Sequence, residues 1–492
     1  MPGRLGSFKS IDPEDHPVSA PETDSPATVI EHIAAWVAET PGDWPQSATV
    51  PAIHGITDTI ACMISGATDD AAKGVRRTMS AWSNGAGTST FVSDGAKGVA
   101  PLVAHANGTA AHAQDFDDNF LAAMTHASAV LVPALFAIGE EANASGADLI
   151  DAYIVGLECH AAVGRGVNRS HYLAGWHATA SVGCIGTAAA CARLLGLDAE
   201  QTAMAMSLAV SMAAGVKGQF GSHAKPFQAG MAAENAVKAA SFARDGVIGR
   251  TTVLEGRFGF MDLAGGGNAP GWDFAKHPLG NPLVIEAVGL APKCHPCCGS
   301  THKSIDNLMD LKRDHGFAPE DVAAIHAEVN ESNVRNLSFD NPQNEMEGRF
   351  SMQYCLAVAL AHDFLSLSDF TPEAVMRPER RALMPLTTMS ATPPEAETMA
   401  GGADTSLPHT LTVTLKSGDV LTATRRSAKG TLGDPFTDDD RWRKFEDCCG
   451  PVLGEARTAA LYETCGGLAD VTALTDLAAM MAAASAAGVK VA

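Results

Sequence analysis

Apolar residues recur at helical spacing in one long segment after another between residues 28 and 245, and this pattern constrains the fold more than any other feature. Val29, Ile33 and Val37, for example, lie four residues apart and mark one face of a helix. Small residues are abundant between them, which allows helices to pack closely. The sequence therefore predicts a large helical bundle in this region. The segments that carry the pattern are 29–37, 52–65, 129–142, 149–164, 178–197 and 229–245.

The pattern changes after Leu263. Three consecutive glycines at 265–267 and the Pro-Gly-Trp sequence at 270–272 indicate turns. Farther on, residues 323–330 alternate as a strand does. A Lys-Ser-Gly-Asp turn at 416–419 lies between two strand-like segments and is a hairpin signal. Because residues 351–364 keep a helical pattern, this region predicts a smaller α+β domain.

The helical pattern returns after Gly430, in the segments 440–449, 455–465 and 468–487. We therefore expect a mainly α protein, in which the N- and C-terminal parts form a large all-helical bundle domain and a smaller α+β domain is inserted between them. Residues 1–26, rich in Pro, Ser, Asp and Glu, are predicted to form a disordered arm. The other expected boundaries are 27–284 for the first helical part, 285–428 for the inserted domain and 429–492 for the C-terminal helical part.

The charge of the chain limits its partners. The 492 residues include 34 Lys and Arg against 56 Asp and Glu, a formal net charge of −22. Such an acidic surface repels nucleic acid and anionic membranes, so neither is an expected partner. No uninterrupted apolar stretch reaches about 18 residues, so no membrane-spanning helix is expected. We see no secretory signal, and the eleven cysteines lie mostly inside apolar helical patterns. These features favour reduced thiols and a cytoplasmic location.

A cluster of acidic residues is followed closely by a histidine. Asp115, Asp117 and Asp118 fall within four residues, and His126 comes just before an apolar run. Carboxylates and an imidazole at two helix ends can converge on one cavity, which is how acid/base sites are often built. The alternative is structural, with the aspartates and the histidine capping helices. Residue types alone leave both interpretations open.

Common cofactor and nucleophile motifs are missing from the sequence. The chain has no Gly-x-Gly-x-x-Gly after a strand, no Walker loop, no His-Glu-x-x-His and no Gly-x-Ser-x-Gly. One metal-like cluster at 293–298 places Cys294 and Cys297 at the spacing of a zinc knuckle. A second such pair is missing, since Cys448 and Cys449 are adjacent. We therefore expect a turn whose lysine and thiol face a cavity, and no metal site.

Five short motifs, in order along the chain, resemble the MmgE/PrpD family. They are Asp-Phe-Asp-Asp at 115–118 with Thr-His-Ala-Ser at 125–128, Gly-Trp-His-Ala at 175–178, Lys-Pro-Phe-Gln at 225–228, the turn at 293–302, and Phe-Ser-Met-Gln-Tyr at 350–354. The match spans nearly the whole chain beyond residue 27. The family includes 2-methylcitrate dehydratase, cis-aconitate decarboxylase and iminodisuccinate epimerase. The resemblance therefore implies an enzyme that acts on a small di- or tricarboxylate.

The resemblance also implies a homodimer, no cofactor and no metal, with the active cleft between the helical and the α+β domains. The catalytic residues that it implies are Asp115, His126, His177, Lys225 and Tyr354. The substrate-binding residues that it implies are Asn119, Ser128, Lys293, Cys298 and His302.

These residue types suit the removal of a proton next to a carboxylate. His126 or His177 can serve as base or acid, because an unperturbed imidazole titrates at about pH 6.5. Asp115 is expected to orient an imidazole and fix its tautomer. Lys225 and Lys293 are expected to hold the substrate carboxylates against the negative charge of the chain.

Tyr354 is expected to donate a hydrogen bond or to relay a proton to a leaving hydroxyl. Structural alternatives stand beside these roles, with His177 as a helix cap, Lys225 as an exposed loop residue and Tyr354 as a core residue. Two positions also depart from the family's pattern. Ala127 replaces the proline of a common His-Pro-Ser motif, and Asn119 stands where threonine is frequent.

Loss of water, loss of carbon dioxide and simple reprotonation can all follow from a similar enediolate, so the family does not choose among them. Our first hypothesis is a cofactor-independent lyase that eliminates water, as 2-methylcitrate dehydratase does. The alternatives are an epimerase of an α-substituted dicarboxylate and a cis-aconitate-type decarboxylase. A further alternative is a non-catalytic protein that binds a metabolite with the same fold.

Overall fold

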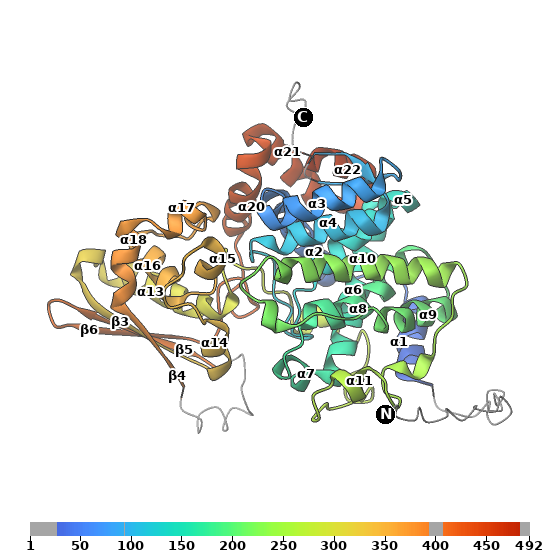
Figure 1. Ribbon diagram of the computed structural model, residues 1–492, viewed down its shortest axis with the longest axis horizontal. Coiled ribbons are helices and arrows are strands. Elements are labelled where there is room, and N and C mark those ends of the chain that lie inside the picture. Colours follow the sequence, from blue (N-terminus) through green and yellow to red (C-terminus); the bar gives the residue numbers. More distant parts are fainter. Residues whose placement is uncertain (1–26, 93, 393–406, 483–492) are drawn as a thin grey trace, which may run out of the picture.

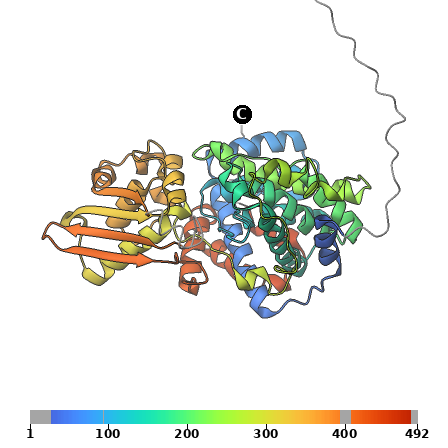
Figure 2. The ribbon, with the colours of Figure 1, turned by 90° about the horizontal axis from the view of Figure 1, so that it is seen from below.

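The computed structural model describes residues 27–92, 94–392 and 407–482, so the arm expected at residues 1–26 lies outside the described residues. The described chain is mainly α, as predicted, with one four-stranded sheet and one short two-stranded pairing. Figures 1 and 2 place the four-stranded sheet to one side of a large group of helices. Among the described residues, no helix combines the length and the apolar character needed to cross a lipid bilayer.

The larger part of the fold is a group of helices around one hydrophobic core. Helices α4 and α10 lie against each other near its centre. They approach closely because the contact is made by glycine: a Cβ added at Gly230 would lie 2.2 Å from the carbonyl oxygen of His105. The elements of the N-terminal part are α1 (Val29–Glu39), α2 (Gln46–Gly66), α3 (Asp70–Ser83), β1 (Ser89–Thr90), β2 (Lys97–Gly98), α4 (Ala100–Ala113), α5 (Ser128–Ala142), α6 (Gly146–Val167), α7 (Ser170–Leu173), α8 (Ala178–Leu194), α9 (Ala199–Val210), α10 (Ala224–Arg244), α11 (Phe260–Ala264) and α12 (Val284–Ala287).

The C-terminal helices return to this same core. Helix α20 (Asp438–Leu453) packs against α2, and α21 (Glu455–Gly466) and α22 (Leu474–Met481) follow it. Figure 1 shows these red helices beside the blue helices of the N-terminal part. Residues 468–487 had been expected to form one helix. Instead, a 3-10 turn at Leu468–Asp470 precedes α22, and the residues beyond 482 lie outside the described part.

The sheet belongs to a second, smaller hydrophobic core. Its strand order is β4-β3-β5-β6, in which β3 runs parallel to β4 and antiparallel to β5, and β5 and β6 form the predicted hairpin. Alternating burial along β5 shows that one face is covered, and Figure 1 shows the helices over that face. The elements are α13 (Gly299–His315), β3 (Val322–Val329), α14 (Glu331–Asn336), α15 (Glu345–Gly348), α16 (Met352–Ala361), α17 (Pro372–Val375), α18 (Pro378–Leu383), β4 (Thr387–Ala391), β5 (His409–Leu415) and β6 (Val420–Arg425).

These two cores are made by the segments that the sequence analysis assigned to the helical and to the α+β parts. The division of the chain into separate domains at 284/285 and 428/429 stays a prediction.

Candidate active site

A cavity of about 870 Å³ lies between the two cores. Loop 115–126, which follows α4, forms one wall together with the end of α6 and the segment 270–277. The start of α13, residues 332–336 and residues 426–433 come from the part of the chain around the sheet. Both parts of the fold therefore contribute to one site.

The cavity is strongly basic, although the chain as a whole is acidic. Among the described residues that line it, the carboxylates are Asp115 and Asp273. The N-terminus of α13 also opens on the cavity through Gly299 and Ser300 and adds the positive end of a helix dipole. Such a lining suits a ligand with several negative charges. The basic residues are Arg165, Arg169, Lys225, Lys276, Lys293, Lys303, Arg426 and Lys429.

Asp115 holds two of these lysines in place. Its carboxylate accepts a hydrogen bond from Nζ of Lys225, and Nζ of Lys293 lies 3.1 Å from the same oxygen. Lys293 also donates to the backbone oxygen of Asp115 at 2.8 Å. Burial works against the charged carboxylate, but the two lysines keep the pKa of Asp115 below its usual range. The backbone of Asp115 has φ 53°, a strained conformation of the kind found at functional sites.

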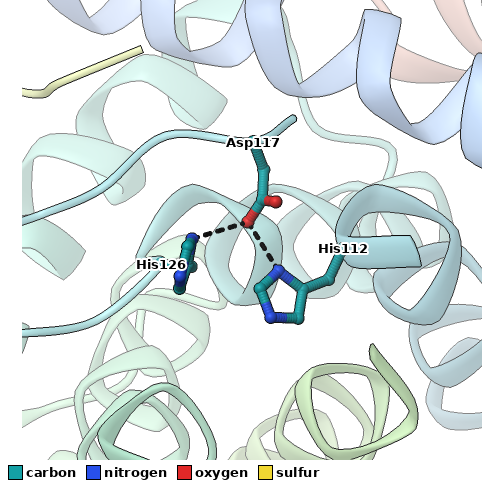
Figure 3. A group of neighbouring side chains, drawn as sticks. All are labelled: His112, Asp117 and His126. Carbon is teal, nitrogen blue, oxygen red and sulfur yellow. Dashed lines mark hydrogen bonds and ion pairs between the residues drawn. The ribbon is translucent and has the colours of Figure 1, made fainter. Parts of the chain in front are cut away.

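Asp117, and not Asp115, orients histidines. Its Oδ2 lies 2.8 Å from Nδ1 of His112 and 3.2 Å from Nδ1 of His126, and Figure 3 shows both rings beside this carboxylate. Burial opposes ionisation of Asp117, yet the two histidines hold the pKa of Asp117 well below its usual range. An ionised carboxylate at both Nδ1 atoms favours the tautomer with hydrogen on Nδ1. Nε2 of His126 is then free to accept a proton.

Burial keeps these imidazoles neutral. It lowers the pKa of His112 to about 4 and moves the pKa of His126 below its ordinary value, and the positive charges of Lys225 and Lys293 act in the same direction on His126. Asp117 opposes both shifts without reversing them. A neutral imidazole that faces a cavity at pH 7 is suited to act as a base.

His177 is a second neutral histidine of the cavity. Its Nδ1 lies 2.7 Å from Oε1 of Gln228, whose amide nitrogen donates to the carbonyl of Val216 at 3.2 Å. The amide is thereby fixed, so Nδ1 of His177 is the donor. Burial, with the charges of neighbouring basic groups, lowers the pKa of His177 well below its ordinary value. His177 occupies the N-cap position of α8, but its side chain makes no capping hydrogen bond.

Eight of the ten residues implied by the resemblance line the cavity: Asp115, Asn119, His126, His177, Lys225, Lys293, Cys298 and His302. Lys225 is not a loop residue, because α10 begins at Ala224 and holds this lysine in its first turn.

Ser128 and Tyr354 do not line the cavity, which corrects their expected roles. The hydroxyl of Ser128 contacts Asp118 and lies 2.6 Å from the hydroxyl of Tyr153 inside the helical core. Tyr354 is fully buried and donates its hydroxyl hydrogen to the backbone oxygen of Asp369. The structural alternative therefore describes Tyr354 better than the proton relay.

The sequence analysis missed three residues that shape the site. His112 lies five residues before Asp117, and this spacing at the end of a helix was a usable signal. Asp117 was seen in the acidic cluster, but nothing in the sequence separated its role from that of Asp115. Gln228 follows Lys225 by three residues on α10, and only the fold brings it to His177.

Lys444 supports the loop that carries these aspartates. Its Nζ donates to the backbone oxygen of Phe116 at 2.7 Å and lies 2.7 Å from the carboxylate of Asp58. Phe116 separates Asp115 from Asp117, so α20 fixes the loop between the lysine contacts and the histidine contacts. The C-terminal part of the chain thus contributes to the geometry of the site.

One group in the described residues has the composition of a metal site: donor atoms of His112, Asp117 and His126 lie within 4.8 Å of one another. The hydrogen bond of His112 and the ion-pair contact of His126 with the same carboxylate oxygen account for this spacing. In the zinc-knuckle candidate, Cys297 instead lies 3.1 Å from the hydroxyl of Thr301. The absence of a metal or cofactor from the reaction stays a prediction.

Two domain models of one known family match most of the chain. The MmgE/PrpD N-terminal domain matches residues 31–273, and the MmgE/PrpD C-terminal domain matches residues 295–466. The chain belongs to the MmgE/PrpD family. The two matched regions correspond to the helical part and to the region from the sheet into α21.

Several MmgE/PrpD relatives are named as decarboxylases. Cis-aconitate decarboxylase of Aspergillus terreus is 25% identical over 481 residues, which cover 93% of this chain and 96% of the relative. Cis-aconitate decarboxylase of Mus musculus is 27% identical over 394 residues, 76% of this chain and 77% of the relative. The cis-aconitate decarboxylase-like protein oryM of Aspergillus oryzae is 27% identical over 372 residues, 70% of this chain and 76% of the relative.

The state of His126 predicts how activity depends on pH. If His126 acts as the base, its neutral imidazole is the reactive form. Because the pKa of His126 lies below the ordinary value, kcat/KM is then retained through pH 6.5 and falls only at lower pH. In Asp117→Asn the residual activity falls at still lower pH, because the carboxylate that raises the pKa of His126 is gone. The pH profiles of wild type and Asp117→Asn are measured with the same substrate, so that the ionisation of the substrate affects both equally and does not change their difference. A wild-type acid limb at or above pH 6.5 contradicts a neutral His126.

Proposed function

We propose that the chain is an enzyme that moves a proton at the carbon next to a carboxylate of a small di- or tricarboxylate. The observation that carries the proposal is the position of His126, beside Asp117 and in a cavity that also holds Lys225 and Lys293. Burial moves the pKa of His126 below its ordinary value, which suits a base. A base and two fixed cations are what formation of an enediolate requires.

The reaction follows from the position of these groups. Nε2 of His126 takes the proton from carbon, and the electron pair of the broken C–H bond moves into the enediolate. The ammonium groups of Lys225 and Lys293 stabilise its negative charge. Because Asp115 already fixes both lysines, little reorganisation is needed when the charge develops.

Elimination of water is the first candidate outcome. The electron pair of the enediolate re-forms the carboxylate and makes an alkene as the neighbouring C–O bond breaks. The leaving hydroxide takes the proton that Nε2 of His126 has accepted, so that it departs as water and His126 becomes neutral again. Histidines that are neutral at pH 7 favour this outcome over loss of carbon dioxide, since elimination begins with the removal of a proton.

Loss of carbon dioxide is the second candidate, and the names of the relatives favour it. Here a C–C bond breaks, the electron pair stays on carbon next to an alkene, and that carbon then takes a proton. Identity of 25–27% supports the family and leaves the choice to experiment.

Parallel product assays test the proposal. Citrate, 2-methylcitrate, cis-aconitate and iminodisuccinate are incubated with the protein, and alkene absorbance, carbon dioxide and optical rotation are followed. We expect an alkene without carbon dioxide from one of the citrates. Carbon dioxide supports the second candidate, and a change in rotation alone supports the epimerase. Lys225→Ala should lower kcat/KM at least about thirtyfold, whereas Lys276→Ala, at an exposed lysine of the same cavity, should not. If neither these compounds nor citrates and cis-aconitates with longer side chains react, the proposal is wrong.

The homodimer that the family implies also stays a prediction. Light scattering should give twice the chain mass of 50.9 kDa.

A further inference from the structure

Large apolar side chains surround the basic cavity and remain exposed to solvent. Leu121, Leu173, Val288 and Leu432 all line it, with 37% to 58% of each residue exposed. Exposed apolar surface beside a pocket commonly marks a place where a ligand binds. A small polycarboxylate has no apolar part that would use it.

Three of these side chains lie on adjoining segments. An antiparallel bridge joins Asn119 to Ala291 through two hydrogen bonds of 2.9 Å, which brings the chain around Leu121 alongside residues 288–290. A Cβ added at Gly289 would lie 2.8 Å from Cγ of Leu432, so this leucine covers the same segment. We call Leu121, Val288 and Leu432 the apolar rim.

The cavity continues past the catalytic groups along walls that are firmly held. Trp272 donates from Nε1 to the carbonyl of Ala162 at 3.0 Å, and a Cβ at Gly166 would lie 2.0 Å from its ring. Phe274 stacks on His32 with ring centroids 4.1 Å apart. Pockets of about 300–1,000 Å³ hold drug-sized ligands, and a volume of about 870 Å³ leaves room beyond a substrate of six or seven carbons.

We propose that the substrate carries an apolar substituent of several carbons on its polycarboxylate head. This inference rests on the proposed function, because Lys225, Lys293 and His126 bind and deprotonate the head. The substituent lies along the apolar rim and is partly removed from water there. The basic lining and the apolar rim thus recognise the two ends of one amphipathic molecule.

The test is a series of citrates and cis-aconitates that bear a methyl, butyl or hexyl group. Burying methylenes against the rim should raise kcat/KM for the hexyl compound about tenfold over the methyl compound. Leu121→Asn combined with Leu432→Asn should abolish this ratio. Leu263→Asn changes a leucine that is 70% exposed outside the cavity, and it should leave the ratio unchanged.

Each other result overturns the inference in a recognisable way. If the methyl compound reacts and longer chains give equal or lower kcat/KM, the substituent is wrong and the proposed function stands. If the double variant changes the mass in solution and not the ratio, the rim is a contact between copies of this chain. If no member of the series reacts and no compound of the unsubstituted panel does, both proposals fail together.

Discussion

Asp117→Asn is expected to lower kcat about a thousandfold, within the range that general acid–base catalysis contributes. The amide keeps the shape of the carboxylate but removes the negative charge that both His112 and His126 face. The Nδ1–H tautomer of His126 is then no longer favoured, and the imidazolium formed by proton transfer has no counter-charge. KM should change far less than kcat, because Asp117 is fully buried and is not part of the cavity lining.

The neighbouring carboxylate provides the control. Burial raises the pKa of Asp118 to about 7, so this group is largely protonated at pH 6 and asparagine resembles it. Asp118→Asn should therefore lower kcat less than tenfold at pH 6. Circular dichroism and thermal unfolding verify that both variants fold. If kcat of the folded Asp117→Asn variant falls less than tenfold, Asp117 does not orient the base.

Asp115→Asn should cost stability as well as activity. The side chains of Lys225 and Lys293 are only 5% and 1% exposed, so loss of the carboxylate leaves two buried ammonium groups without their main counter-charge. Removing one partner of a buried ion pair costs about 3–5 kcal/mol. For a chain of this size that lowers Tm by about 3–5 °C. Asparagine tolerates positive φ, so backbone strain should not change.

The pH dependence of this loss has a definite sign. The folded pKa of Asp115 is depressed, so its stabilisation is complete above the unfolded pKa of about 3.9 and disappears as the pH falls below that value. The difference in Tm between wild type and Asp115→Asn should be constant near neutrality and shrink in acid. Asp273→Asn, at the exposed acidic residue of the same cavity, should leave Tm unchanged. Equal Tm values for all three proteins contradict the role of Asp115.

Local patterns explain which parts of the fold were predictable. The hairpin of β5 and β6 was marked by a glycine turn between two strand-like segments. The start of α22 was placed too early, because an Ala- and Leu-rich sequence keeps helical character through the 3-10 turn at Leu468–Asp470. The parallel pairing of β3 with β4 joins segments about 60 residues apart in sequence, which no local pattern specifies.

The sequence predicted most residues of the candidate site but not the contacts between them. The motifs indicated Asp115, His126 and Lys225 as site residues, and all three line one cavity in the structure. They did not show that Asp115 contacts lysines while Asp117 contacts histidines. The two aspartates are only two residues apart, and the conformation of the folded loop decides which neighbours each one contacts. Both roles of Tyr354 stayed open, because a buried hydroxyl paired with a backbone oxygen has the same sequence signature as a proton relay.

Deuterium exchange at the α-carbon tests the central claim most directly. The protein is incubated in deuterated water with the substrate that reacts, and proton NMR follows the signal of the hydrogen next to the carboxylate in recovered substrate and product. Wild type and His277→Gln, a change at an exposed histidine of the same cavity, should exchange at the same rate, and His126→Gln should exchange at least about a hundredfold more slowly. Exchange by His126→Gln at the wild-type rate would show that His126 is not the base.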